Sequence, residues 1–279
     1  PRMNMNQLKI DYETKYKRIL EDSYVDPKAE VSLPPLAVSF GYSNTTNPFP
    51  IGIGSYGNFS FLQAPPKSKK TFFLSLVAMA YMCGETDRTK VMKGYRDNKK
   101  LIHYDTEQGK FHAHKVFRRV TDACGHSDDY LTYALRQYSP MERLDFIDWH
   151  LNNTQDIGLV IIDGIVDLML DSNDLKESSK VVQYLMKWTQ ELNIHIITAI
   201  HSNWNSEKPT GHLGSFLEKK AETQIALELS DQKHIAIVKC MRSRGFPFEK
   251  FAFEVDNQGL PNILESIPEE INKDKYLKI

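Results

Sequence analysis

Lys70 and Thr71 are the adjacent residues whose types and position most directly suggest chemistry. They follow a strand-like run at 58–64 and a short loop, and they open an apolar helical run at 70–82. In a phosphate-binding loop the lysine ammonium reaches the β- and γ-phosphates, and the threonine hydroxyl ligates Mg²⁺. The segment therefore predicts a site for ATP and Mg²⁺ made by Ala64, Pro65, Pro66, Lys67, Ser68, Lys69, Lys70 and Thr71.

The same loop departs from the G-x-x-x-x-G-K-[ST] pattern. Ala64 and Lys69 stand where the two glycines are expected. Without glycine the backbone is less free to wrap its amides around a phosphate. Because the motif is weak by itself, the prediction depends on residues further along the chain.

Acidic residues follow two of the later apolar runs. Asp163 ends the run at 159–162, and a carboxylate at the carboxyl end of a sheet strand can hold Mg²⁺ beside a phosphate loop. Glu107 follows the run at 101–105 and is the candidate base that deprotonates the attacking water, with Asp105 as the alternative. The competing interpretation is that these acids only occupy solvated turns.

His201 ends a further apolar run at 194–200 and precedes a polar loop at 202–215. A polar residue in this place can contact the γ-phosphate and report its loss to the following loop. The amides, the lysine and Trp204 of the loop predict contact with single-stranded DNA. A structural histidine and a mobile surface loop remain the alternatives.

Lys239, Arg242 and Arg244 lie close together near a predicted turn. In an oligomer such cations can reach a neighbouring subunit and stabilise the charge of its γ-phosphate, as an arginine finger does. The alternative is a solvated basic turn.

Strands and helices must alternate along the chain to position these residues. Continuous apolar runs fit strands that are covered on both faces, and the alternation predicts an α/β fold with a mostly parallel twisted sheet flanked by helices. After residue 220 the helices are expected to stop, and short antiparallel strands are expected to follow. The predicted strands are 58–64, 101–105, 130–135, 157–162, 194–200, 223–229, 234–239 and 248–255, and the predicted helices are 70–82, 109–123, 140–152 and 175–192.

Composition limits the class of protein. The 279 residues are 41% hydrophobic and 25% charged, as in an ordinary globular protein, and the net charge of -1 gives no global attraction for nucleic acid. Cys83, Cys124 and Cys240 fit no metal or redox spacing, which predicts buried free thiols in a reducing cytoplasm. No apolar run is long enough for a membrane span, so no membrane association is expected.

With these motifs in order, the chain resembles the RecA-like ATPases, in particular the hexameric helicase branch of the RepA and DnaB types. It is most similar to single-domain proteins of mobile elements whose loop reads G-K-A-K-S-R-K-T, against Ala64-Pro-Pro-Lys-Ser-Lys-Lys-Thr71 here. The resemblance covers roughly residues 50–256. It implies that Lys70 and Thr71 hold phosphate and Mg²⁺, and that a hexameric ring forms. It also implies that Glu107 is the catalytic glutamate, that Asp163 is the acid of the Mg²⁺ strand and that His201 is the γ-phosphate sensor. By the same resemblance, Lys239 and Arg242 or Arg244 are fingers supplied to the adjacent subunit.

The resulting prediction is an N-terminal helix and linker at 1–50, a RecA-like ATPase core at 51–260 and a tail at 261–279. The predicted function is an ATP-hydrolysing, DNA-associated motor of a plasmid or mobile element. Because the loop lacks glycine, a non-catalytic RecA-like assembly or loading module is the alternative. A RecA-type recombinase or a KaiC-like regulatory ATPase is a third, less favoured interpretation.

Overall fold

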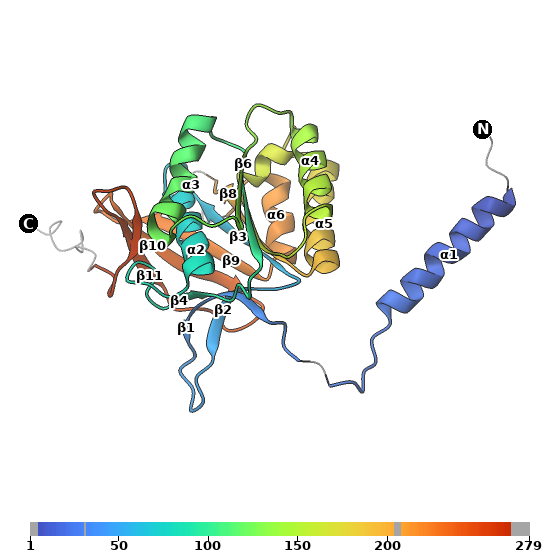
Figure 1. Ribbon diagram of the computed structural model, residues 1–279, viewed down its shortest axis with the longest axis horizontal. Helices are drawn as coiled ribbons and strands as arrows, with labels where there is room; N and C mark the ends of the chain where they lie inside the picture. Colours follow the sequence, from blue (N-terminus) through green and yellow to red (C-terminus); the bar gives the residue numbers. More distant parts are fainter. Residues whose placement is uncertain (1–4, 31, 204–207, 269–279) are drawn as a thin grey trace, which may run out of the picture. The chain divides into compact units, whose positions relative to one another are not determined.

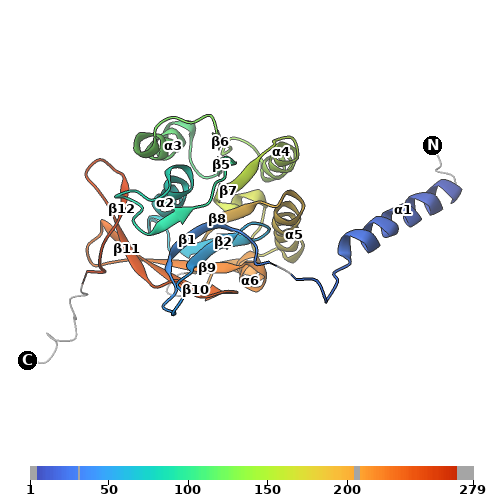
Figure 2. The same ribbon diagram turned by 60° about the horizontal axis from the view of Figure 1, so that its bottom comes forward.

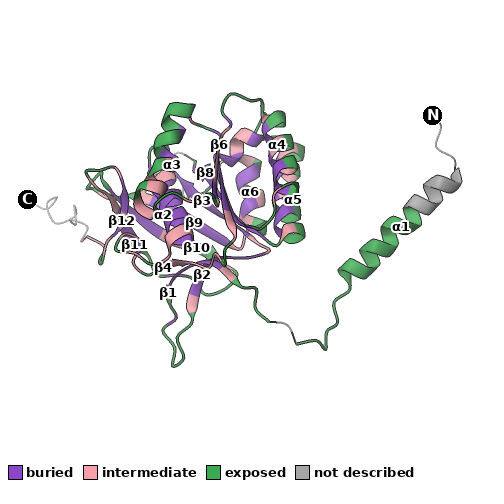
Figure 3. Cartoon of the chain, viewed as in Figure 1, coloured by how far each residue is buried: buried purple, intermediate pink, exposed green. Residues whose placement is uncertain are grey.

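The computed structural model describes residues 5–30, 32–203 and 208–268, with side chains described from residue 12 onward. The chain divides into two compact units, Pro1–Leu33 and Pro34–Ile279. The first unit contains helix α1 (Met5–Ser23), which agrees with the predicted N-terminal helix. Its described apolar side chains, including Tyr12 and Leu20, are exposed (Figure 3).

A nine-stranded sheet forms the centre of the second unit. Strands β6, β5, β7, β8, β3 and β9 run parallel, and β10, β11 and β12 continue the sheet in antiparallel order. This arrangement confirms the predicted fold class. In spatial order the strands are β12 (Pro261–Ile263), β11 (Phe251–Val255), β10 (Ile235–Ser243), β9 (Thr223–Leu229), β3 (Phe59–Ala64), β8 (His195–His201), β7 (Ile157–Asp163), β5 (Lys100–Asp105) and β6 (Tyr130–Ala134).

Helices cover both faces of this sheet (Figures 1 and 2). On one face, α2 (Lys70–Cys83) and α3 (Lys110–Cys124) contribute to an apolar core that includes Phe73 and Val120. On the other face, α4 (Pro140–Asn152), α5 (Leu175–Leu192) and α6 (Gly211–Lys220) contribute to a second core. The run of β7 is continuously apolar because both of its faces are buried. Leu159 and Ile161 pack into the first core, and Val160 and Ile162 pack into the second.

A small antiparallel sheet packs beside α2. It consists of β1 (Leu36–Tyr42) between β2 (Pro50–Ser55) and β4 (Met92–Gly94). Together with β12, it extends the second unit beyond the predicted 51–260 core at both ends.

Two expectations from the sequence are corrected. The segment 202–215 is not one loop, because α6 begins at Gly211 and runs to Lys220. Its apolar residues Leu213 and Leu217 are completely buried, and this tertiary contact outweighs the loop-like composition of the segment. Cys83 and Cys124 form a disulfide that joins the ends of α2 and α3, so that Cys240 is the one free thiol in the described chain.

Candidate nucleotide site

The phosphate loop between β3 and α2 adopts a tight turn without glycine. Lys67 and Lys69 have φ values of 63° and 65°, in the left-handed region that side chains usually avoid. Each such residue costs roughly 1–2 kcal/mol of backbone strain. Lys69 therefore takes the conformation that the missing glycine would take, and the chain enters α2 at Lys70 as a phosphate loop requires.

The Lys70 ammonium lies inside this turn. Nζ is 3.2 Å from the Pro65 carbonyl oxygen and 3.0 Å from Nδ1 of His201. Burial lowers the pKa of Lys70, while the negative charges of Glu107 and Asp163 act in the opposite direction. The ammonium thus interacts with the charges of Asp163, at the end of β7, and Glu107, which follows β5. A phosphate group could replace the loop carbonyls as its partner.

His201 connects Lys70 to Glu107. Because Lys70 donates to Nδ1, the neutral imidazole carries its proton on Nε2, which lies 3.6 Å from Oε1 of Glu107. The hydrogen bond from His201 is the main reason that the pKa of Glu107 is lowered. The Glu107 carboxylate is therefore ionised and solvent-accessible, as a base that accepts a proton from water must be.

Asp163 lies beneath this group and is only 2% exposed. It interacts with the Thr71 hydroxyl, yet its Oδ2 is buried without a hydrogen-bond partner among the described residues. Burial raises the pKa of Asp163 to about 7, and the nearby Asp105 and Glu107 add to the effect. An unpartnered carboxylate oxygen beside a threonine hydroxyl is the donor set that Mg²⁺ prefers, so the residues present fit this ion.

Asp105, the alternative base, has a different role in the structure. Its Oδ1 accepts the backbone N–H groups of Glu107 and Gln108, at 3.1 and 2.8 Å. It therefore shapes the turn that presents Glu107 instead of facing the Lys70 ammonium. Burial raises the pKa of Asp105, and the two backbone donors oppose that rise.

Sequence reasoning missed several residues that fix this site. The Thr106 hydroxyl donates to the Asp163 carbonyl at 2.8 Å and lies 2.9 Å from Oδ2 of Asp167. Gly164 has a φ of 103° and packs so close to Thr106 that an added Cβ would lie 2.4 Å from the hydroxyl oxygen. The Arg119 guanidinium lies 3.7 Å from the ring centre of Phe72, the residue that follows Thr71. No pattern in the sequence marked Thr106 or Arg119, because their partners come from other strands and helices.

Lys70, Glu107, Asp163 and His201 together form the Lys70 cluster. The basic residues Lys239, Arg242 and Arg244 lie apart from it in sheet order, since β9 separates β10 from β3. Lys239 forms an ion pair with Glu228 at 2.6 Å, and Arg244 donates to the Lys220 carbonyl at 2.8 Å. The exposed Arg242 guanidinium has no hydrogen bond or ion pair within the described chain. These residues therefore remain candidates for a role in a neighbouring subunit.

The loop after His201 is short. Ser202 and Pro209 form an isolated β-bridge, and Asn203 N–H donates to the Lys208 carbonyl at 2.9 Å. Trp204 and Asn205, which the sequence predicted to contact DNA, lie outside the described residues. This paired base of the loop begins at Ser202, directly after His201.

The same architecture occurs in known proteins. A family model described as "AAA domain" matches residues 51–207, which is more than half of the chain. The chain belongs to the AAA domain family. This AAA domain contains the whole Lys70 cluster within the matched residues, whereas Lys239, Arg242 and Arg244 lie outside them.

A solved structure of the RadB recombinase has a similar fold. The TM-score is 0.52 with 15% sequence identity, and the match covers 74% of this chain and 91% of that chain. No curated protein matches the sequence. Family and fold together support a nucleotide-binding RecA-like ATPase domain, a class that generally uses ATP and Mg²⁺. Among the described helices, none has the length and apolar character needed to cross a membrane.

Proposed function

We propose that this AAA domain binds and hydrolyses Mg·ATP and acts as a DNA-associated motor of the replicative-helicase type on a plasmid or mobile element. The convergence of Lys70, Asp163, Glu107 and His201 at the carboxyl ends of β3, β7, β5 and β8 carries the proposal.

Each residue has a defined task. Lys70 binds the β- and γ-phosphates, and Glu107 accepts the proton of the attacking water. Thr71 and Asp163 would hold Mg²⁺, which neutralises the phosphate charge that develops during transfer. His201 lies between Lys70 and Glu107, so that loss of the γ-phosphate alters its contacts and, through Ser202, the loop that follows.

We further propose that the domain works as a homo-oligomer, a hexameric ring, and that single-stranded DNA contacts the loop after β8. Arg242 supports this part of the proposal because it is exposed and its guanidinium has no partner within the described chain. In a ring, Lys239, Arg242 or Arg244 would act on the nucleotide of the adjacent subunit.

ATPase assays with and without single-stranded DNA test the motor. Lys70→Ala should lower turnover by about 10²–10³-fold, because it removes the ammonium that faces the transferred phosphate. Lys176→Ala is the matched control, since Lys176 is an exposed lysine on α5, outside the phosphate loop. Equal rates for the wild type and Lys70→Ala would refute hydrolysis at this site.

A non-catalytic assembly module is the second candidate, and the strained turn favours it. Lys67 and Lys69 occupy left-handed conformations, and the Lys70 ammonium contacts the loop's own Pro65 carbonyl. Isothermal titration with Mg·ATP separates the two functions. Binding with turnover supports the motor, and binding without turnover or no binding supports the module.

A further inference from the structure

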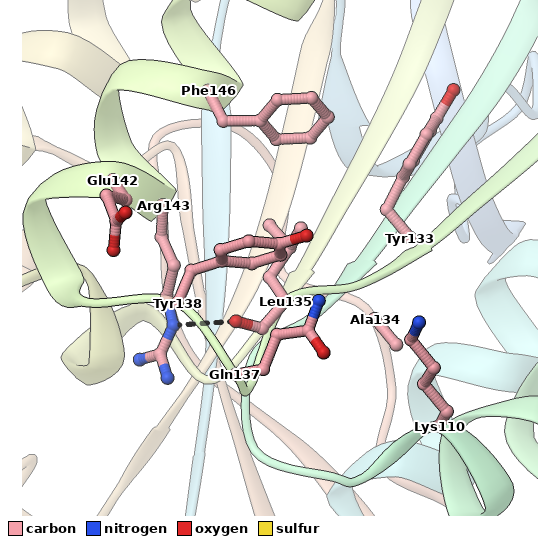
Figure 4. Close-up of a pocket in the computed structure, with 9 residues that line it drawn as sticks. All are labelled: Lys110, Tyr133, Ala134, Leu135, Gln137, Tyr138, Glu142, Arg143 and Phe146. Atoms are coloured by element: carbon pink, nitrogen blue, oxygen red, sulfur yellow. Dashed lines mark hydrogen bonds between the residues drawn. The ribbon is translucent and has the colours of Figure 1, made fainter.

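A furrow lies at the carboxyl end of β6, the edge strand of the large sheet, which has no further neighbouring strand within the described chain. Two cavities of about 430 and 300 Å³ share Lys110, Ala134 and Gln137 and together form this furrow. It lies between the ends of β5 and β6 and the first turns of α3 and α4. In Figure 4 the Lys110 amine and the Gln137 amide point toward an opening bordered by the rings of Tyr138, Tyr133 and Phe146.

Two of the rings that border the furrow, Phe146 and Tyr133, are held in place by His150. Phe146 stacks on His150 with ring centres 5.4 Å apart and an interplanar angle of 8°. The His150 imidazole is fixed by the hydroxyls of Tyr133, at 3.1 Å, and Tyr104, at 2.6 Å. Tyr138 remains 45% exposed at the mouth. The Phe146 and Tyr133 rings are therefore preorganised faces on which a flat group can stack.

The charged side chains of the furrow leave a positive surplus. Lys110 and Arg136 are exposed, and within the described chain neither side chain forms a hydrogen bond or an ion pair. Glu142 is already bound to the Ser139 hydroxyl and backbone N–H, at 2.7 and 2.8 Å. The Arg143 guanidinium is used internally, because it donates to the carbonyls of Leu135, Arg136 and Asp167.

We propose that this furrow binds single-stranded nucleic acid, with Lys110 and Arg136 on phosphates and with bases stacked on Tyr138 and Phe146. Free cations beside rigid aromatic faces and side-chain amides are the combination that such strands require. An extended peptide pairing with the edge of β6 is the competing occupant, but uncommitted positive charge favours a polyanion.

The furrow adjoins the nucleotide site. Gln108, which lines its inner end, directly follows Glu107. At the other side, Arg143 links the Arg136 carbonyl to Asp167, whose carboxylate is the partner of Thr106. The end of β8, where the loop after His201 begins, is three strand spacings from β6, or about 14 Å. One single-stranded nucleic acid can therefore extend from that loop to the furrow. Binding in the furrow requires no ATP hydrolysis.

Fluorescence anisotropy with labelled oligothymidylate, on the full chain without nucleotide, tests the proposal. Tyr138→Ala should weaken binding at least about fivefold, whereas Tyr138→Phe keeps the ring and should bind as the wild type does. Lys110→Gln with Arg136→Gln should reduce the slope of log K against log salt by about 1.4, which corresponds to two lost phosphate contacts. Lys70→Ala should bind normally, which separates this site from the ATPase.

Lys233→Gln and Tyr42→Ala are matched controls on exposed residues away from the furrow. Thermal unfolding should show that every variant remains folded, and the salt slope gives a second readout that does not depend on Tyr138. Wild-type affinity and slope in the furrow variants would overturn the proposal. A change in sedimentation without a change in oligonucleotide binding would also overturn it and would assign the edge to a protein partner.

Discussion

The Lys70 cluster and the basic segment 239–244, at the end of β10, differ in where their partners come from. His201 contacts both Lys70 and Glu107, and the three residues lie at the ends of β8, β3 and β5 of one chain. Lys239 and Arg244 instead form contacts near their own strand, with Glu228 and the Lys220 carbonyl. The first region is assembled by the fold, whereas the second would become part of a site only when another subunit supplies the nucleotide.

Strand geometry explains the difference. The carboxyl ends of parallel strands meet at one edge of a sheet, so residues far apart in the sequence are brought together automatically. On β10, Lys239 lies opposite Ala226 and Arg242 lies opposite Gln224, on either side of a register shift. Residues 224 and 226 share one face of β9, so the shift also places Lys239 and Arg242 on one face.

The largest expected effect concerns the cluster. Glu107→Gln should lower ATP turnover by about 10²–10⁴-fold while Mg·ATP affinity remains near that of the wild type, because only the proton acceptor is lost. Single-turnover hydrolysis and isothermal titration measure the two quantities. The exposed Glu85→Gln is the control, and substantial turnover by Glu107→Gln would transfer the role of base to another residue.

The next largest effect concerns the basic segment. Arg242→Ala should lower turnover by about 10³-fold without loss of nucleotide binding, if its guanidinium stabilises a neighbour's γ-phosphate. Mixing it with Glu107→Gln subunits should restore part of the activity, since each variant supplies what the other lacks. Arg244→Ala is the comparison, because the Lys220 carbonyl already engages that guanidinium. No recovery on mixing would argue against action between subunits.

A smaller effect, on stability, should distinguish the two regions by pH. The folded state holds the Asp163 proton up to about pH 7, whereas an unfolded chain releases it near pH 3.8. This group's stabilising contribution is therefore complete below pH 3.8 and is lost as pH rises to 7. In nucleotide-free protein, Asp163→Asn should raise the free energy of unfolding by on the order of 4 kcal/mol at pH 8 and by less at pH 5.

Urea unfolding at the two pH values measures this difference. Asp145→Asn, at an exposed position, is the control. In the basic segment, the effect of Lys239→Met on the free energy of unfolding should not change comparably between pH 5 and pH 8. If Asp163→Asn raises the free energy of unfolding equally at pH 5 and pH 8, ionisation of the buried Asp163 carboxyl does not destabilise the folded state.

The smallest effect concerns the backbone of the phosphate loop. Lys69→Gly should stabilise the protein by at most about 1 kcal/mol, because relief of the left-handed strain exceeds the added freedom of the unfolded chain. Lys69→Ala loses the same side-chain contacts but keeps the strain, so it should show no gain. If both variants unfold at the same urea concentration, the turn is not strained.

Particular residues show how far the sequence could be interpreted. The continuous apolar runs correctly indicated the parallel strands β7 and β8, because burial on both faces demands such runs. The α6 residues were not recognised, because Gly211 and Gly214 resemble loop residues and only packing of Leu213 and Leu217 makes the helix stable. The Cys83–Cys124 pair also depends on helix packing that sequence spacing does not encode.

The sequence alone determined the alternation of strands and helices between residues 58 and 200 and the residue types at the strand ends, since hydrophobic period and length depend only on local chemistry. Tertiary structure decided which of those side chains meet. It placed the His201 imidazole between Lys70 and Glu107, turned Asp105 toward backbone amides and left Asp163 with an unpartnered oxygen. These outcomes depend on strand register and burial, which follow from the packing of the complete fold.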